Sequence, residues 1–120
     1  MALIQQSTRR KLKYGSWDIG GKIVKEDDRY IVKDNTELNN LVVSSTRLNA
    51  GKSTTGHRHA GQEEVYIFIK GKGQMELDHK IFDVCEGDTV LIKDNVFHKV
   101  HNNSDFILEF ICVFDGRRNI

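Results

Sequence analysis

Residues 51–71, GKSTTGHRHAGQEEVYIFIKG, decide the fold and hold the first candidate ligands. Two histidines, His57 and His59, stand two positions apart, and Glu64 opens the apolar run that follows them. Residues i and i+2 of an extended chain point to the same side, so these two imidazoles can act together. The run after Glu64 is rich in β-branched and aromatic residues, which favour a β-strand. The stretch therefore links a candidate ligand set to the start of a strand.

Similar short runs lie on both sides of this stretch, separated by turns rich in Gly, Asn and Asp. Turns at intervals of roughly 8–12 residues are typical of an antiparallel sandwich or barrel. No long window shows the 3.6-residue period of an amphipathic helix. We therefore predict an all-β fold, with strands near residues 30–33, 41–48, 64–70, 74–77, 81–84, 89–93, 96–100 and 106–114.

The length and charge of the chain exclude several classes of protein. With 120 residues it has the size of one domain, and 18 Lys+Arg against 17 Asp+Glu leave a formal net charge of +1. Such a balance gives no basis for binding nucleic acid or an anionic membrane. Its apolar runs fall far short of the ~20 residues of a transmembrane helix, and its first residues do not resemble a secretory signal. We expect a cytoplasmic protein with a basic arm or edge segment at residues 1–13 and a barrel domain at residues 14–120.

Two of the predicted strands, residues 64–70 and 106–114, are largely apolar on both faces. A barrel strand with water on its outer side is normally polar on that side. The outer face must therefore be covered, either by the N-terminal segment or by a second subunit. Of these two alternatives we favour a homodimer.

A further histidine, His98, lies far along the chain in another predicted strand. Together with His57, His59 and Glu64 it makes a set of three imidazoles and one carboxylate, which suits Fe, Mn, Ni or Zn. The alternative is that His57 and His59 are exposed loop residues and His98 an ordinary surface residue. The residue types alone leave both interpretations open.

The spacing of the first stretch resembles the first motif of the cupin family. That motif runs Gly, five residues, His-x-His, three or four residues, Glu, six residues, Gly. Every fixed position is met, by Gly51, His57, His59, Glu64 and Gly71.

The second cupin motif runs Gly, five residues, Pro-x-Gly, two residues, His, three residues, Asn. Gly87, His98 and Asn102 match it, whereas Lys93 and Asn95 replace the proline and the second glycine. Asn tolerates the left-handed backbone conformation that glycine supplies, so the turn can be kept. Lys93 lacks the fixed φ of proline, which makes the turn looser.

The resemblance implies a single-domain jelly-roll β-barrel that binds one divalent transition-metal ion through His57, His59, Glu64 and His98. It also implies a small-molecule substrate inside the barrel. The first motif looks like that of sugar-phosphate isomerase cupins, so a metal-dependent isomerase or lyase is the first expectation. The alternatives are an Fe(II)-dependent dioxygenase and a non-catalytic cupin that binds a small molecule.

Three other side chains are candidates for the site or for its surroundings. Tyr66 shares the strand face of Glu64, and is either an acid/base catalyst or a core aromatic residue. Arg47 could hold a carboxylate or phosphate of the substrate, or be solvated. Glu109, among apolar neighbours, is either a paired charge at an interface or a second acid near the site.

We expect structural roles, outside the site, for the remaining histidines and for the two cysteines. His101 has the opposite parity to His98 and is expected on the exterior, and His79 falls in a hairpin tip. Cys85 and Cys112 both lie among strand-forming residues, so we expect two buried free thiols.

Overall fold

The computed structural model of the chain describes residues 17–116 and residue 118. The predicted arm at residues 1–13 lies outside this range. The described part contains no helix, and so none long and apolar enough to cross a membrane. The all-β prediction is confirmed, with these strands: β1 Lys22–Glu26, β2 Tyr30–Asn35, β3 Leu41–Leu48, β4 Glu64–Lys70, β5 Lys72–Leu77, β6 Lys80–Cys85, β7 Thr89–Ile92, β8 His98–His101 and β9 Leu108–Asp115.

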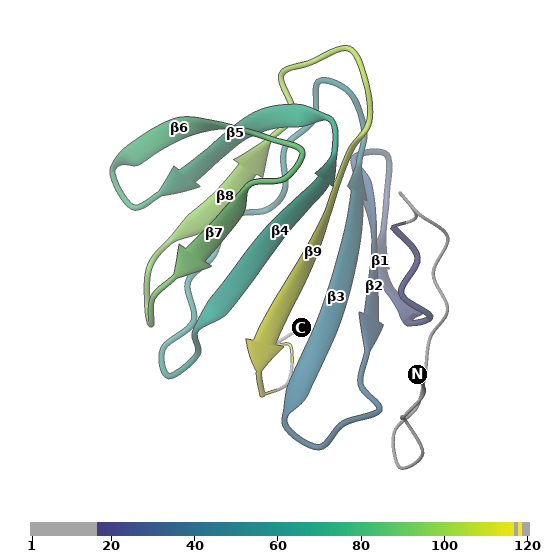
Figure 1. Cartoon of the computed structure of the whole chain (residues 1–120), viewed down its shortest axis with the longest axis vertical. Helices are drawn as coiled ribbons and strands as arrows, with labels where there is room; N and C mark the ends of the chain where they lie inside the picture. The colour runs from purple at the N-terminus through teal and green to yellow at the C-terminus, as the bar shows by residue number, and fades with distance from the viewer. Residues whose placement is uncertain (1–16, 117, 119–120) are drawn as a thin grey trace.

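The strands form two antiparallel sheets, as the jelly-roll prediction requires (Figure 1). The larger sheet has the order β1-β2-β3-β9-β4-β7, and the smaller has the order β6-β5-β8. Strand β9 thus lies between β3 and β4, which precede it by many residues in the sequence. The core between the sheets is built from alternate residues of these strands, among them Leu48, Phe68, Met75, Val100 and Phe110, each 1% exposed or less.

Strand β1 was not predicted. Its sequence, KIVKE, has only two apolar residues between charged ones, and in the structure no residue of the strand is buried. It pairs with β2 through a register irregularity between Ile23 and Lys25. Because it is the edge strand of the larger sheet among the described strands, it needs neither a long apolar run nor strict alternation.

Asn102, the last fixed position of the second motif, holds two distant segments together. Its Nδ2 donates to the backbone carbonyls of Leu48, Asn49 and Phe106, at 3.1, 3.2 and 2.7 Å. Its Oδ1 accepts from the backbone and hydroxyl of Ser104. The side chain, 1% exposed, therefore ties the end of β3 to the loop that leads into β9.

The described residues cover the outer face of the larger sheet only in part. Trp17 lies against it, with its ring 5.1 Å from the Arg47 guanidinium and 5.3 Å from the Lys33 ammonium group. Farther along the same sheet, Ile67 and Leu91 are 37% and 71% exposed. An exposed apolar area of this kind is typical of an interaction surface. The homodimer stays a prediction.

The two cysteines differ in a way that the sequence did not indicate. Both are free, and Cys112 is buried as expected, but Cys85 is exposed. Strand β6 is an edge strand in which only Val84 is buried, so the neighbouring position points away from the core. The prediction of a buried Cys85 was wrong because strand-forming residues do not reveal which face of an edge strand is covered.

Candidate metal centre

The structure brings all four ligands predicted from the sequence together. His57 and His59 lie in the loop between β3 and β4, Glu64 is the first residue of β4, and His98 is the first of β8. One ligand atom from each of them lies within 4.8 Å of the others. Donors bound to one ion at about 2.0–2.2 Å are roughly 3–4 Å apart, so the cluster is close in size to a coordination shell.

Backbone hydrogen bonds place the loop histidines opposite β8. His57 and His98 form an isolated antiparallel bridge, with N···O distances of 3.1 and 2.9 Å. Asn95 donates its backbone N–H to the carbonyl of His59 at 2.9 Å. Asn95 has a φ of 62°, the left-handed conformation expected where the motif has glycine. The turn survives the substitution, and it anchors His59.

Three donor atoms in the cluster are buried and have no hydrogen-bond partner among the described residues: His57 Nε2, Glu64 Oε1 and His98 Nε2. His98 Nδ1 lies 3.0 Å from the carbonyl oxygen of Val96. A carbonyl only accepts, so Nδ1 carries a proton, and in the neutral ring Nε2 presents its lone pair to the cluster. Nε2 lies 3.1 Å from Glu64 Oε1, so the two atoms face each other inside the cluster. Buried polar atoms without partners are rare, and their meeting at one place indicates a site for a cation.

The surroundings keep the loop imidazoles neutral. Burial, together with the neighbouring His98 and His59, lowers the pKa of His57 to about 3. Burial also lowers the pKa of His59, against the opposing effect of the Glu64 carboxylate. Only the neutral form of imidazole has a free lone pair for a metal ion. The donor set therefore fits a divalent transition metal in both residue type and protonation.

Tyr66 lies beside the cluster, with its ring centroid 5.7 Å from that of His98. It lines a cavity of about 30 Å³ that His57 and Glu64 also line. The ring stacks on Phe110 at 5.3 Å, so the side chain belongs to both core and cavity. Burial raises the pKa of the Tyr66 hydroxyl well above its usual value. The phenol therefore stays protonated and can donate a hydrogen bond or a proton.

Arg47 is not brought to this cavity. Along β3 the side chains of Ser44, Thr46 and Leu48 are buried, whereas Arg47 points to the outer face. Its Nε donates to Glu109 Oε2 at 2.8 Å, and Glu109 is 1% exposed. Of the two interpretations of Glu109, the structure therefore shows the paired charge. His101, also facing away from the cluster, binds Ser53 and Glu76 through its two ring nitrogens.

A different arginine lines the cavity, and the sequence analysis missed it. Arg118 follows β9 and contacts the carboxylate of Asp34 in β2 and the hydroxyl of Ser44 in β3. Asp34 precedes Arg118 by 84 positions. No local pattern signals such a pairing, and only the folded sheet brings the two residues together.

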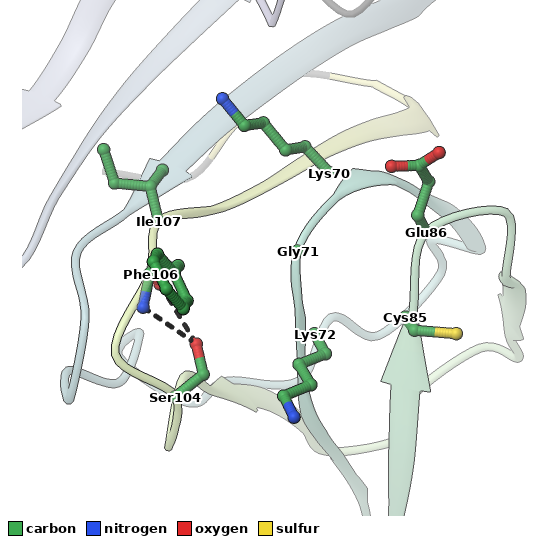
Figure 2. Close-up of a pocket in the computed structure, with 8 residues that line it drawn as sticks. All are labelled: Lys70, Gly71, Lys72, Cys85, Glu86, Ser104, Phe106 and Ile107. Atoms are coloured by element: carbon green, nitrogen blue, oxygen red, sulfur yellow. Dashed lines mark hydrogen bonds between the residues drawn. The ribbon is translucent and has the colours of Figure 1, made fainter.

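A larger cavity, of about 480 Å³, shares no residue with the cluster (Figure 2). It lies around the turn between β4 and β5 and is walled by Phe106 and Ile107 on one side and by Cys85 on the other. The hydroxyl of Ser104 is already engaged with the backbone of Phe106. None of the candidate site residues lines this cavity.

Comparison with known proteins gives relatives of several kinds. The chain is 31% identical over 94 residues to an uncharacterized protein of Methanocaldococcus jannaschii, covering 69% of this chain and 75% of the relative. It is 26% identical over 94 residues to an oxalate-binding protein of Thermotoga maritima, covering 78% of each. A solved structure of a sugar phosphate isomerase of the cupin superfamily from Silicibacter pomeroyi superposes with a TM-score of 0.69 at 20% identity. It covers 75% of this chain and 61% of that one.

The family model of the cupin domain matches residues 44–114, which is more than half of the chain. The matched region runs from β3 to β9 and includes both motifs and all four residues of the cluster. On this evidence the chain belongs to the cupin family.

Proposed function

We propose that this cupin binds one divalent transition-metal ion through His57, His59, Glu64 and His98, and acts as a lyase on a small carboxylate. The observation that carries the proposal is the meeting of three buried ligand atoms, His57 Nε2, Glu64 Oε1 and His98 Nε2, that have no hydrogen-bond partner among the described residues outside the cluster. The oxalate-binding relative from Thermotoga maritima supports the choice of substrate class.

The bound ion would supply Lewis acidity to a substrate oxygen, with up to two coordination positions left open by four protein donors. The residues of the chain would supply the walls of the substrate cavity and a proton for the substrate. Tyr66, which lines the cavity and is buried and protonated, would donate a proton to the substrate. Backbone hydrogen bonds to His98 fix the position of His57, and Glu64 is fixed as the first residue of β4. These two residues would therefore hold the end of the cavity where the ion binds in place.

The lining of the cavity supports a lyase more than a sugar-phosphate isomerase. An isomerase must take a proton from carbon, which needs a free base near the substrate. Among the described residues that line the cavity, Glu64 is the only carboxylate, and it belongs to the ligand set. Burial raises the pKa of Tyr66, so little of the phenolate form that could act as a base is present. A lyase needs a proton donor instead, because the carbon atom must be protonated after its bond breaks. The protonated Tyr66 could supply that proton.

A second function, binding without turnover, is favoured by the size of the cavity. Its volume of about 30 Å³ is far below the roughly 300–1,000 Å³ of ordinary small-molecule sites. It holds about two water-sized groups. A site this small can hold a small anion, whereas a catalytic cycle also requires the product to leave and new substrate to enter.

The first test is the metal content of protein purified without chelators and without a metal-affinity column. We expect close to one equivalent of Fe, Mn, Ni or Zn per chain, measured by elemental analysis. Protein that stays free of metal after incubation with each of these ions in turn would contradict the proposal. Iron with O₂-dependent turnover would support the dioxygenase alternative instead.

The role of Tyr66 is tested by Tyr66→Phe, which removes the hydroxyl and keeps the ring that stacks on Phe110. We expect release of CO₂ from oxalate to fall by about 10²–10⁴-fold in kcat, because the proton donor is lost. The metal content should stay unchanged. An unchanged kcat would assign Tyr66 to the core alone. If wild-type protein binds oxalate but releases no CO₂, the binding function replaces the lyase.

A further inference from the structure

We propose that Arg118 forms the anion subsite of the cavity, where it binds the carboxylate group of a small ligand whose other end faces the histidine cluster. The inference rests on the proposed function and names the residue that selects its substrate class. It starts from one observation: a guanidinium from the segment after β9 lines the same small cavity as His57 and Glu64.

The guanidinium of Arg118 is held in one orientation. Its Nε and Nη2 donate to the two oxygens of Asp34, at 2.7 and 2.9 Å, and Nη2 also donates to Ser44 Oγ at 3.0 Å. The side chains of Arg118 and Asp34 are 14% and 4% exposed. The Phe114 ring lies 5.2 Å from the guanidinium carbon. A group fixed in this way loses little conformational entropy when it binds a ligand.

Arg118 keeps donors for a ligand. Its third nitrogen, Nη1, makes no hydrogen bond to any residue that the structure describes, although Nε and Nη2 are both engaged. A guanidinium stays protonated in proteins and cannot accept, so both N–H groups of Nη1 remain available. Planar N–H groups of this kind match the oxygens of a carboxylate.

The balance of charge in the cavity favours an anion. Arg118 and Lys25 are the cationic side chains of its lining, and Glu64 is the carboxylate. Asp34 neutralises one positive charge, through its ion pair with Arg118. When a divalent ion joins the cluster, positive charge exceeds negative charge in this small volume. Electrostatic attraction in a confined site then selects negatively charged ligands.

The size of the cavity narrows the class of anion. A volume of about 30 Å³ holds about two water-sized groups, which suits the two oxygens of a carboxylate. The hydroxyl-bearing side chains of Ser44, Thr46 and Tyr30 add polar contacts around that position. The cavity therefore points to a small carboxylate.

The test is calorimetric titration of the metal-loaded protein with oxalate, for wild type and for the double variant Arg118→Gln/Asp34→Asn. The double change removes the buried pair as a whole and leaves no lone charge in the core. We expect one metal ion per chain in both proteins, and an oxalate Kd about 10- to 100-fold higher in the variant. An unchanged Kd would overturn the assignment of Arg118.

The matched control is Arg47→Gln/Glu109→Gln, which removes a similar pair from the outer face of β3 and should leave the oxalate Kd unchanged. A thermal melt of each variant confirms that it is folded. Inorganic phosphate is titrated in parallel, and tighter binding of phosphate than of oxalate would contradict the carboxylate class.

Failure of the proposed function gives a different result. If wild-type protein takes up no metal ion, the proposed function is wrong, and the metal-free protein is titrated instead. Binding of oxalate that is lost in the Arg118→Gln/Asp34→Asn variant would then still support the subsite. Absence of binding to metal-free wild-type protein would overturn both.

Discussion

The His98→Ala variant is expected to lose its metal ion, with an affinity at least a hundredfold below that of wild type. His98 is the only predicted ligand that comes from the smaller sheet, and its Nε2 is one of the buried donors without a hydrogen-bond partner. Loss of a residue that only orients a ligand already costs 10–100-fold in metal affinity, so loss of the ligand itself costs more. The barrel should remain folded, since its stability comes from the apolar strands around the cluster. Elemental analysis and a thermal melt measure the two effects separately.

The matched control is His101→Ala. His101 lies on the same strand, β8, but its ring is engaged with Ser53 and Glu76 on the side away from the cluster. This variant should keep a full equivalent of metal, even if its melting temperature falls. Full metal occupancy in His98→Ala would show that the ligand set is wrong.

The largest loss of stability is expected from Arg47→Met. The Glu109 carboxylate is 2% exposed and has its salt bridge with Arg47 at 2.8 Å. Removal of the guanidinium leaves a buried negative charge without a partner, which costs about 3 kcal/mol in the free energy of unfolding. The estimate takes the lower end of the usual range because the Arg47 side chain is 39% exposed and water can partly replace it. Urea denaturation at neutral pH measures the change.

A second variant separates the charge from the packing. Arg47→Met/Glu109→Gln also removes the unpaired negative charge of Glu109, and we expect it to recover most of the lost stability. If the single and double variants are equally unstable, the loss comes from contacts of the Arg47 side chain, such as that with Trp17. A single variant as stable as wild type would show that the pair contributes nothing.

The elements that could be predicted from sequence were those encoded by neighbouring residues. The strands at Leu41–Leu48 and Glu64–Lys70 were predicted with the bounds that the structure has, because their apolar residues are dense and turn residues flank them. The cluster was implied by the resemblance of two segments to the cupin motifs. The left-handed conformation of Asn95 followed from the chemistry of one side chain in one turn.

Other features depend on which strands become neighbours, and that information is not local. Arg47 and Arg118 are both arginines beside β-rich segments, and nothing in their immediate surroundings in sequence separates them. Glu109 lies directly opposite Arg47 in the pairing of β3 with β9, and this register keeps Arg47 on the outer face. Asp34, on the distant strand β2, binds the guanidinium of Arg118 and so holds it at the cavity. The choice between the two arginines therefore needed the fold.

The position of β9 between β3 and β4 has a consequence for how the protein is made. Until residues 108–115 leave the ribosome, both β3 and β4 present an unpaired edge to the cell, although every ligand of the cluster has already been synthesised. Unpaired edges favour association with other chains. A nascent chain stalled before Leu108 should therefore be a target for chaperones.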